Sequence, residues 1–354
     1  MKNEVLKMVV CLSVRRIDGE KARELLVKHG LLDDRYKIKS DCERVCFPIK
    51  PGVELKRVVK ELPGSKLIDD FFEFKNKVFT RGLREVLQSY LGVYEKERLP
   101  KSYDLIGGLM LIELKEELWS ERFKIGAIIK ENFKHIRGVF AKKGSVEGEF
   151  RVREVECIGG DCNPVTVHLE NGCRYHLDLT KVYFNSRLGS ERLRVAEKIS
   201  PNETVIDMFA GVGPFTILIA KKRVEVNAID SNPDAVFYLK KNIIENRVEK
   251  YVNVFLGRAE QIVTEYLKRK ADRIIMNLPA DSLNYLKYAC EGLKEGGGVI
   301  HLYFFSGEKD FDLKLRSIDK NISEVGYKIR QMLTRRVREI APYRYMYCVD
   351  LTLH

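Results

Sequence analysis

The sequence lacks the long apolar segments that mark a membrane-bound or exported protein. None of the apolar runs in its 354 residues approaches the roughly 18 residues that a membrane span needs. The first residues, Met1-Lys2-Asn3-Glu4, do not lead into the apolar core of a signal peptide. We therefore expect a cytoplasmic protein with no membrane partner.

The eight cysteines include no Cys-x-x-Cys pair, the spacing typical of redox and zinc sites. A disulfide-framed scaffold is not expected at this length, so we interpret the cysteines as reduced thiols. Five potential metal ligands lie close together in the sequence: Cys157, Cys162, His168, Cys173 and His176. Alternating apolar and polar residues around Asn171-Gly172 favour an ordinary β-hairpin, which would place His168 and Cys173 on opposite faces. We expect no metal site.

Acidic residues are outnumbered, since 63 Lys and Arg residues against 51 Asp and Glu residues leave a net charge of +12. A basic protein of this kind suits a polyanionic partner, and nucleic acid is the first candidate. Two clusters are expected to contact phosphates, Lys142-Lys143 and Arg335-Arg336-Arg338 with Arg344. The second cluster also carries Tyr343 and Tyr345, which could stack on bases.

The chain contains no internal repeat or low-complexity tract, and its length predicts two or three domains with apolar cores. Residues 1–70 are expected to form a small α+β domain, followed by a charged linker at 69–77. Its expected elements are a strand at 5–14, a helix at 18–30 and strands within 36–49. Residues 78–178 are expected to form a second α+β domain, with helices at 84–91 and 119–133 and strands after 103–104 and at 138–141 and 150–157.

Residues 179–354 show a different pattern. Short, β-branched apolar runs alternate with helix-like segments, which is typical of a parallel sheet with helical crossovers. The expected strands are 204–208, 224–229, 252–256, 273–276 and 298–305. The last two runs, 327–333 and 345–353, flank Pro342 without room for a helix and should pair antiparallel. The predicted fold class is α/β, a Rossmann-like parallel sheet with an antiparallel final hairpin, preceded by two smaller α+β domains.

A glycine turn follows the first of these strands, in the run from Asp207 through Gly211-Val212-Gly213 to Phe215. Glycines at a strand-to-helix turn let the backbone approach a nucleotide-like ligand. Thr216 stands where a dinucleotide site has its third glycine, and Asp207 would repel a phosphate. The pattern therefore favours a cationic cofactor, S-adenosylmethionine, and a class I methyltransferase sheet. The alternative is a tight turn without a ligand.

Three further strand ends are expected at the same crevice. The second strand ends at Asp230, placed to accept both hydroxyls of a ribose. After the third strand, the backbone of Arg258 and Ala259 is expected to meet an adenine. The fourth strand runs into Asn277-Leu278-Pro279, where the amide offers a donor and an acceptor to a base, and the proline fixes the loop and exposes a carbonyl. This tripeptide only partly matches the Asn-Pro-Pro-aromatic motif of amino-methylating enzymes.

Several segments carry a further signal: Phe150-Arg151-Val152-Arg153-Glu154, Val182-Tyr183-Phe184-Asn185-Ser186-Arg187-Leu188, Glu191-Arg192, Asp207 to Phe215, and Met276-Asn277-Leu278-Pro279. Together they resemble the archaeal tRNA (guanine-37-N1)-methyltransferases. The likeness covers nearly the whole chain, including Gly30-Leu31-Leu32 and Ser102-Tyr103-Asp104. It implies methyl transfer from S-adenosylmethionine to N1 of guanosine 37, beside the tRNA anticodon.

The resemblance also implies roles for single residues. Glu191 matches a general base and Arg151 a residue that stabilises charge on guanine O6. Asn277 and Pro279 are expected to hold the target base after it leaves the anticodon-loop stack. The residues expected around the cofactor are Tyr183, Arg187, Arg192, Phe209, Gly211, Gly213, Asp230, Ser231, Arg258, Ala259 and Asn277.

The chemistry of guanine agrees with these two catalytic assignments. Guanine N1 carries a proton at neutral pH, so its attack on a methyl group needs a base at N1 and a cation near O6. A carboxylate in the first turn of a helix, such as Glu191, has its pKa lowered by the helix dipole, whereas burial raises it. Without the resemblance, ordinary ion pairing would be the preferred interpretation of both Glu191 and Arg151.

The resemblance implies a monomeric enzyme that contacts the tRNA anticodon loop and, through its first domain, the tRNA elbow. Two alternatives share the fold. One is a bifunctional relative that also methylates the wyosine precursor, and the other is an aminocarboxypropyl transferase of wyosine synthesis. A third possibility from a different class is a non-catalytic tRNA-binding protein.

Overall fold

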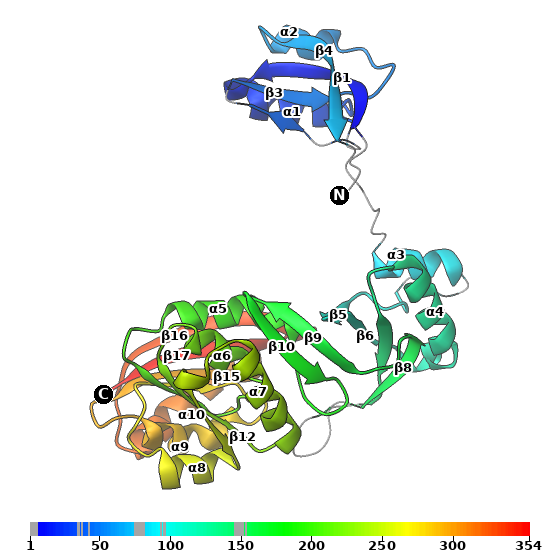
Figure 1. Cartoon of the computed structure of the whole chain (residues 1–354). Coiled ribbons are helices and arrows are strands. Elements are labelled where there is room, and N and C mark those ends of the chain that lie inside the picture. The colour runs from blue at the N-terminus through cyan, green and yellow to red at the C-terminus, as the bar shows by residue number, and fades with distance from the viewer. Residues whose placement is uncertain are drawn as a thin grey trace. The chain divides into compact units, whose positions relative to one another are not determined.

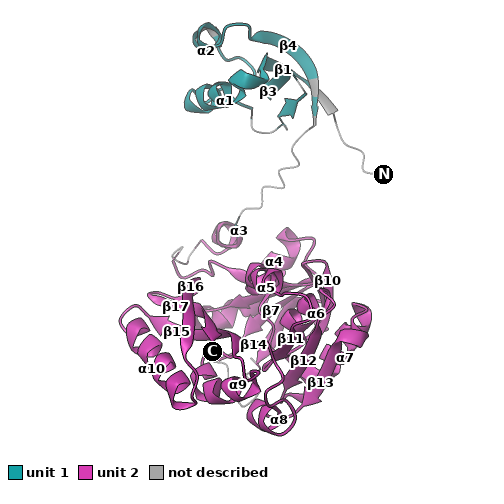
Figure 2. Cartoon of the chain, turned by 90° about the vertical axis from the view of Figure 1, so that its left-hand side faces the viewer, with its two compact units in different colours: residues 1–82 teal, residues 83–354 magenta. Residues whose placement is uncertain are grey.

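The computed structural model describes residues 6–33, 36, 38–41, 43–73, 82–92, 94, 97–144, 152 and 154–354. The chain forms two compact units, Met1–Gly82 and Leu83–His354 (Figure 2). Within the described ranges, no helix is both long and apolar enough to cross a membrane. Arg151 lies outside the described residues, so its proposed role has no structural counterpart below.

The first unit is a four-stranded antiparallel sheet in the order β2-β3-β1-β4. Its elements are β1 (Leu6–Arg15), α1 (Gly19–Lys28), β2 (Lys39–Ser40), β3 (Arg44–Pro48), α2 (Lys56–Glu61) and β4 (Lys66–Glu73) (Figure 1). Both helices share one core with β1, in which Leu12, Leu26 and Val58 are buried. Gly30 follows α1 with a φ of 65°, so the expected glycine stop of this helix is confirmed.

The segment 69–77 was expected to be a linker. Over residues 69–73 this prediction was wrong. Strand β4 pairs antiparallel with β1 over Lys66–Glu73, so the charged residues of this segment belong to the sheet. Charged side chains are common on an edge strand, where one face and one edge meet water. The part of the expected linker at 74–77 lies outside the described residues.

The second unit begins with a four-stranded sheet in the order β5-β6-β7-β8. Its elements are α3 (Leu83–Tyr90), β5 (Tyr103–Ile106), β6 (Leu109–Glu113), α4 (Arg122–Asn132), β7 (Gly138–Lys142) and β8 (Val155–Gly160). Helix α4 connects the parallel strands β6 and β7 and packs on β8 through Gly126. The boundary expected at residue 178 therefore lies inside one compact unit that holds three separate sheets.

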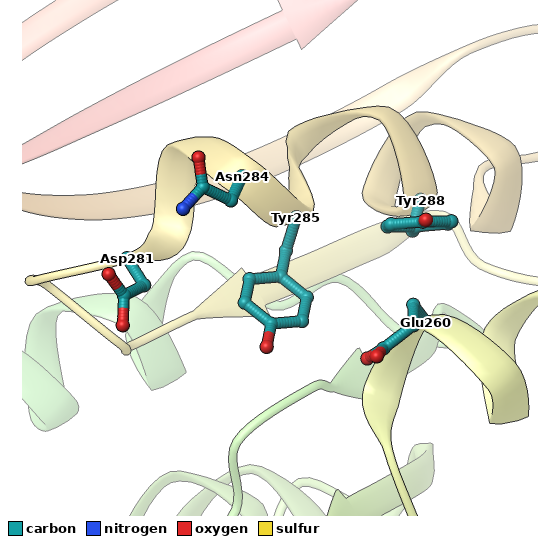
Figure 3. A pocket seen from close by; sticks show the side chains of 5 residues that line it. All are labelled: Glu260, Asp281, Asn284, Tyr285 and Tyr288. Carbon is teal, nitrogen blue, oxygen red and sulfur yellow. The ribbon is translucent and has the colours of Figure 1, made fainter. Parts of the chain in front are cut away.

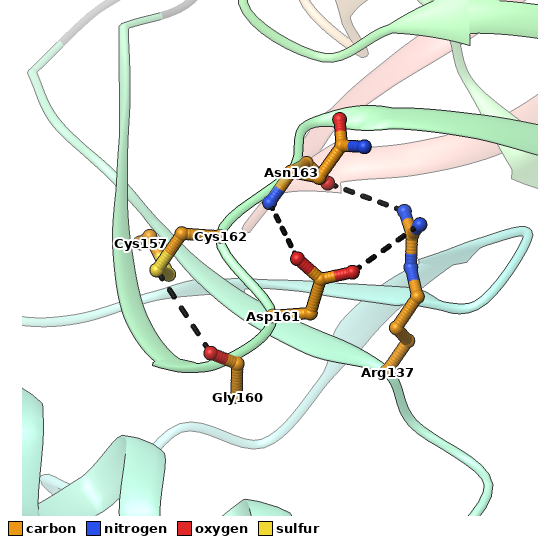
Figure 4. Close-up of a disulfide and its surroundings, with 6 residues drawn as sticks. All are labelled: Arg137, Cys157, Gly160, Asp161, Cys162 and Asn163. Atoms are coloured by element: carbon orange, nitrogen blue, oxygen red, sulfur yellow. Dashed lines mark hydrogen bonds and ion pairs between the residues drawn. A yellow bond between two sulfur atoms is a disulfide. The ribbon is translucent and has the colours of Figure 1, made fainter.

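A disulfide joins Cys157 to Cys162 (Figure 4), so the interpretation of all cysteines as free thiols was wrong. Strand β8 ends at Gly160, whose φ of 75° turns the chain back and brings the two Cα atoms to 5.4 Å. That turn is invisible in a Cys-x4-Cys spacing. Of the other described cysteines, five are free: Cys11, Cys46, Cys173, Cys290 and Cys348.

A two-stranded hairpin follows, with β9 (Val165–Glu170) and β10 (Cys173–Asp178). The predicted turn at Asn171-Gly172 is confirmed, with φ of 49° and 74°. The prediction that His168 and Cys173 point to opposite faces was wrong. Glu170 pairs with Cys173, and side chains two residues apart on a strand share a face, so His168 lies on the face of Cys173.

The largest sheet has the order β13-β12-β11-β14-β15-β17-β16. Its strands are β11 (Thr204–Asp207), β12 (Glu225–Asp230), β13 (Val252–Leu256), β14 (Arg273–Met276), β15 (Gly298–Gly307), β16 (Ile329–Ala341) and β17 (Arg344–Leu353). The first five are parallel, whereas β17 runs antiparallel to both β15 and β16. The Rossmann-like sheet with an antiparallel final hairpin is therefore confirmed.

Helices cover both faces of this sheet (Figure 2). On one face lie α5 (Gly189–Glu197), α6 (Pro214–Ala220) and α7 (Pro233–Glu245), and on the other α8 (Ala259–Tyr266), α9 (Leu286–Gly292) and α10 (Phe311–Glu324). Successive strand residues enter opposite cores, as Val205 and Ile206 do. Burial on both sides explains the continuous apolar runs. Short 3-10 turns lie at Arg16–Asp18, Glu116–Glu121, Ser186–Leu188, Glu249–Tyr251 and Ser282–Tyr285.

The hairpin is joined to the large sheet by two asparagines one turn apart on α7. Asn242 accepts a hydrogen bond from His176 N over 2.6 Å and donates to the carbonyls of His176 and Val212, each over 3.0 Å. Asn246 accepts from Arg174 N over 2.9 Å and donates to its carbonyl over 2.7 Å. The two amides thus bind the backbone N–H and C=O groups of β10 that a neighbouring strand would otherwise bind. Asn242 also fixes the glycine turn through its bond to the Val212 carbonyl.

We expect Gly126→Ala to destabilise the second unit. A Cβ at this position would lie 1.9 Å from the carbonyl oxygen of Ile158, so α4 and β8 would have to separate. Overpacking of this kind costs about 2 kcal/mol or more of the free energy of unfolding. Denaturant unfolding should show a lower midpoint. Gly296→Ala is the control, because no atom lies within 4 Å of its added Cβ; equal stability of the two variants would contradict the packing argument.

Candidate active site

The site lies at the carboxyl edge of the large sheet, where β11, β12 and β14 end at Asp207, Asp230 and Met276. Strand β11 has β12 on one side and β14 on the other. The chain therefore leaves neighbouring strands toward opposite faces of the sheet. A crevice opens at such a switch point, and ligands of open α/β sheets bind there.

The glycine turn has the conformation that its residues predict. Gly211 and Gly213 have φ of 55° and 90°, and Gly213 precedes Pro214, the first residue of α6. A Cβ on Gly213 would lie 2.5 Å from Leu239 Cδ1, so this glycine allows close packing against α7. A Cβ on Gly211 would approach only Tyr183 O, at 4.0 Å, so the backbone at Gly211 stays open to a ligand.

Asp230 holds this turn from the end of β12. Its Oδ2 accepts the Gly211 N–H over 2.7 Å and its Oδ1 accepts the Asn232 N–H over 2.9 Å. Burial raises the pKa of Asp230, against the opposing effect of the two N–H groups. Each carboxylate oxygen has a further lone pair. The contact of Asp230 with a ribose stays a prediction. Ser231 follows it and is half-buried.

Asp207 is the second buried carboxylate of the crevice. Its Oδ2 accepts the Thr216 hydroxyl over 2.7 Å, whereas its Oδ1 has no hydrogen-bond partner among the described residues. Burial raises the pKa of Asp207 to about 6. A buried acceptor without a partner is costly unless a ligand supplies the donor. The sequence did not indicate that Thr216, in the position of the third glycine, has this bonding role.

A cavity of about 380 Å³ lies between the first turn of α8 and the segment that follows Pro279 (Figure 3). It is lined by Glu260, Asp281, Asn284, Tyr285 and Tyr288. Tyr285 also contacts Phe209 edge to face, with ring centroids 5.1 Å apart. Arg258 precedes α8 and donates to Glu260 over 2.6 Å, and Ala259 is buried as the first residue of that helix. Sequence reasoning found Arg258 and Ala259 but missed Tyr285 and Tyr288, whose i,i+3 spacing on the segment after Pro279 was the available signal.

Asn277 and Pro279 follow β14 at the same edge. The Oδ1 of Asn277 is buried and has no hydrogen-bond partner among the described residues. The prediction that Pro279 exposes its carbonyl was wrong, because this oxygen accepts the Phe305 N–H from β15 over 3.1 Å. The bond closes the loop onto the neighbouring strand, and it leaves the Asn277 amide as the polar group of the tripeptide available to a ligand.

Two arginines expected at the cofactor are paired with protein groups. Arg187 donates to Asp104 over 2.5 Å and to Tyr103 O over 3.0 Å, which ties the segment before α5 to β5. Burial acts to raise the pKa of Asp104, but Lys142 and Arg187 hold it below its usual value. Tyr183, on the same segment, is exposed, and its hydroxyl accepts from Asn185 over 3.3 Å.

Arg192 is 2% exposed. Its Nη1 donates to both carboxylate oxygens of Glu170, over 2.8 and 2.7 Å, and its Nη2 donates to Asn185 O over 2.8 Å. Its guanidinium also lies 5.0 Å from the centroid of the Phe184 ring. These bonds join α5, the hairpin and the segment that carries Tyr183, so Arg192 shapes one wall of the crevice.

Glu191 lies in the first turn of α5 with its side chain 3% exposed. Its Oε1 accepts from Arg194 Nη2 over 2.6 Å and from the Tyr303 hydroxyl over 2.9 Å, and its Oε2 accepts from Arg194 Nε over 2.9 Å. The ring of Tyr303 packs on Phe215, immediately after the glycine turn, with centroids 5.9 Å apart. Sequence reasoning identified Glu191 but not Arg194 or Tyr303.

Comparison with known proteins agrees with this geometry. Residues 166–330 match the model of the TRM5/TYW2 methyltransferase domain, and residues 11–56 match that of the tRNA methyltransferase 5 N-terminal domain. Residues 83–163 match the model of the TYW2 N-terminal domain. The three matched regions correspond to the small first unit, the four-stranded sheet and most of the large sheet.

Two archaeal relatives match the chain along almost its entire length. The tRNA (guanine(37)-N(1))-methyltransferase Trm5b of Pyrococcus abyssi is 38% identical over 346 residues, which is 97% of this chain and 98% of that protein. Trm5b of Methanocaldococcus jannaschii is 35% identical over 354 residues, 98% of this chain and 99% of that protein.

Solved structures of such proteins have the same fold. The crystal structure of Pyrococcus abyssi Trm5b matches with a TM-score of 0.72 at 36% identity, covering 98% of this chain and 99% of that one. A complex of aTrm5 with tRNALeu matches at 0.68 and 33% identity, covering 98% and 100%. Trm5 of Methanocaldococcus jannaschii, solved with adenosine, matches at 0.64 and 33%, covering 97% and 98%. With this agreement over its full length, the chain belongs to the family of tRNA (guanine(37)-N(1))-methyltransferases, enzymes that use S-adenosylmethionine.

Proposed function

We propose that this chain transfers a methyl group from S-adenosylmethionine to N1 of guanosine 37 in tRNA. The observation that carries the proposal is that the glycine turn follows β11, the Asn277 loop follows the adjacent β14, and Glu191 is bonded to Tyr303 of β15, the next strand of the same sheet. The carboxylate of Asp230, the amide of Asn277 and the carboxylate of Glu191 suit a ribose, a base and proton transfer in turn.

The residues at the crevice fit S-adenosylmethionine. Asp230 would accept the ribose hydroxyls, and the partnerless Oδ1 of Asp207 would accept a donor from the cationic part of the cofactor. Phe209, Arg258, Ala259 and the cavity at Tyr285 would receive the adenine. When bound, the cofactor supplies an electrophilic methyl group on a positively charged sulfur.

Tyr183, Ser231 and Asn277 would complete the cofactor contacts. Arg187 and Arg192 would support the cofactor site without contacting the cofactor through their charge, because their guanidinium groups are bonded to Asp104 and Glu170. The first bond ties the Tyr183 segment to β5, and the second ties α5 to the hairpin. Gly211 and Gly213 would keep the backbone of that turn close to the ligand.

Glu191 would act as the general base and Arg151 would stabilise charge on guanine O6. The N1 position lies on the Watson–Crick edge of guanine, so the base must leave the anticodon-loop stack before this edge can reach the enzyme. Asn277 would then bind the extruded base through its amide, while Pro279 fixes the loop. Removing the N1 proton gives the ring nitrogen the electron pair that attacks the methyl group.

The basic edge strand β16 would contact the tRNA anticodon loop. Arg335 is 60% exposed and Tyr343, at the turn into β17, is 78% exposed. The Arg336 guanidinium lies 3.3 Å from the centroid of the Tyr345 ring. The other expected cluster is less available, because Lys142 pairs with Asp104 and Lys143 with Glu154. The first unit would contact the tRNA elbow, and we propose a cytoplasmic monomer.

One observation favours a second candidate. Residues 83–163 match the model of the TYW2 N-terminal domain, so an aminocarboxypropyl transferase or a bifunctional methyltransferase acting on the wyosine precursor also suits this chain. The aminocarboxypropyl transfer differs from both methyl transfers in the carbon of the cofactor that is transferred. A non-catalytic tRNA-binding protein would transfer neither group.

Mass spectrometry of the modified nucleoside separates methyl transfer to guanosine from aminocarboxypropyl transfer and from no transfer. We expect N1-methylguanosine from a transcript with guanosine at position 37, and transfer that persists with inosine there, because inosine keeps N1–H and O6 and lacks only the exocyclic amine. A transcript with adenosine at position 37 is the control. An aminocarboxypropyl product, no product, or loss of transfer with inosine would contradict the proposal.

Cofactor binding should depend on pH through Asp207. Because burial raises its pKa to about 6, its ionised fraction falls as the pH drops through 6, and a cationic ligand should bind more weakly there. Calorimetry between pH 5 and 8 should show this loss in the wild-type protein. Asp207→Asn should bind weakly throughout and lose most of the pH dependence, whereas the exposed control Asp312→Asn should behave as wild type. An unchanged pH profile in Asp207→Asn would rule out this role.

Replacing Glu191 by Gln should slow methyl transfer by at least about a hundredfold while leaving cofactor affinity unchanged, since the amide cannot take up the N1 proton. The variant should fold, because Arg194 keeps its second partner, Asp350. Single-turnover transfer of labelled methyl across pH measures the effect. Glu197→Gln, exposed at the end of α5, is the control. Full activity of Glu191→Gln at every pH would exclude Glu191 as the base.

A further inference from the structure

The side chain of Glu191 is hydrogen-bonded to a tyrosine of the large sheet. The hydroxyl of Tyr303, on β15, donates to Oε1 of Glu191 over 2.9 Å, and the tyrosine is fully buried. Arg194 Nη2 donates to the same oxygen over 2.6 Å. Oε1 therefore has two hydrogen-bond donors inside the protein.

The other oxygen of Glu191 has different surroundings. Oε2 accepts one hydrogen bond, from Arg194 Nε over 2.9 Å, and lies 3.6 Å from Nε of the exposed Arg335. The two oxygens therefore differ in their partners. Oε1 is bonded to two donors inside the protein, whereas Oε2 is bonded to one and lies next to an exposed arginine.

Arg194 is itself fixed by a row of buried charged groups. Its Nη1 donates to Asp350 Oδ2 over 2.6 Å, and Asp350 Oδ1 lies 2.6 Å from His301 Nδ1. On its far side, His301 Nε2 lies 2.9 Å from Arg273 Nη1, and Arg273 is bonded to Glu203 over 2.7 and 2.9 Å. Because Arg273 can only donate, we assign the His301 proton to Nδ1, where it faces Asp350.

This row is not a metal site, although His301, Cys348 and Asp350 have potential ligand atoms within 4.8 Å of one another. Cations of the protein already occupy their surroundings. Arg194 and Lys198 each donate to Asp350 over 2.6 Å, and Arg273 covers His301 Nε2. Burial lowers the pKa of His301, so the imidazole is neutral. It hydrogen-bonds Asp350, which in turn fixes Arg194.

We propose that Tyr303 is a positioning residue for Glu191, anchoring Oε1 so that Oε2 receives the proton of guanine N1. This inference rests on the proposed role of Glu191 as the base. As the proton moves from N1 to Oε2, the N1 electron pair forms the bond to the methyl carbon. The carbon–sulfur bond breaks and its electron pair stays on sulfur, so a cationic sulfonium becomes a neutral thioether and the carboxylate becomes a carboxylic acid.

Charged and titratable groups lie around Glu191 on four of the described elements. Arg194 faces it from α5, Tyr303 from β15, Arg335 from β16, and Cys348 and Asp350 from β17. Burial, with the nearby Cys348 and Glu191, raises the pKa of Tyr303 well above its usual value, so its hydroxyl remains a donor across the working pH range. Donation to a carboxylate stabilises the charged form and lowers its pKa.

The test is the pH–rate profile of Tyr303→Phe in the full chain. The substitution keeps the ring that packs on Phe215 and removes only the donor. The substitution removes a donor that stabilises the charged carboxylate, so the acidic limb of kcat should move to higher pH by about one unit. The plateau value of kcat should fall about tenfold because the carboxylate is less well oriented. KM for tRNA and for the cofactor should stay unchanged.

Tyr327→Phe is the matched control. Its hydroxyl donates to Leu293 O and Lys294 O, over 3.4 and 3.2 Å, on a different part of the same unit. This variant should keep both the limb and the plateau of the wild type. A merely structural role of Tyr303 would lower the melting temperature or the amount of active enzyme without moving the limb.

The outcomes separate this inference from the proposed function. If Glu191→Gln is slow and the limb of Tyr303→Phe stays at its wild-type pH, the role of Tyr303 is overturned and the base assignment stands. If Glu191→Gln retains the wild-type rate and limb, both are overturned. Should Tyr303→Phe fail to fold, Arg194→Lys gives the same reading, since it keeps the charge but loses the two-pronged donation and should also move the limb upward.

Discussion

Two arginines of α5, one buried and one half-buried, fix the position of this helix beside the candidate active site. Arg192 and Arg194 point their guanidinium groups to different partners: Arg192 bonds Glu170 of the hairpin, and Arg194 bonds Glu191 and Asp350 of the sheet. A buried charge is tolerated only when it is paired and hydrogen-bonded. Helix α5 therefore has one position that satisfies both arginines, and that position places the hairpin, the Tyr183 segment and Glu191 together.

The crevice combines two kinds of acidic group. Asp230 has both oxygens bonded to backbone N–H groups, so it shapes the glycine turn and still has lone pairs for a ribose. Asp207 has one oxygen bonded to Thr216 and one buried without a partner in the described structure. The first carboxylate fixes the turn, and the second is a buried charge whose cost a cationic ligand would offset. This division explains why a threonine takes the place of a third glycine.

Sequence reasoning succeeded where a pattern is local and failed where a contact depends on the rest of the fold. Short apolar runs separated by helix-like segments predicted the strands of the large sheet. The short connection at Pro342 predicted the final hairpin. The charged segment at 69–73 joined a sheet because β1 offers it a pairing edge. The Cys157–Cys162 bond and the capture of the Pro279 carbonyl by Phe305 each depend on a turn or neighbour that no spacing encodes.

The sequence by itself determined the fold class, the glycine turn, the carboxylates at two strand ends and the family resemblance, because each depends on residue type at a fixed short spacing. Only the tertiary structure decided that Tyr303 and Asp350, more than 100 residues after Glu191, belong to its surroundings. It also decided that Arg187 and Arg192 are bonded within the protein. Pairing of buried charges is a property of three-dimensional proximity, and it arises only after the sheet has brought distant strands side by side.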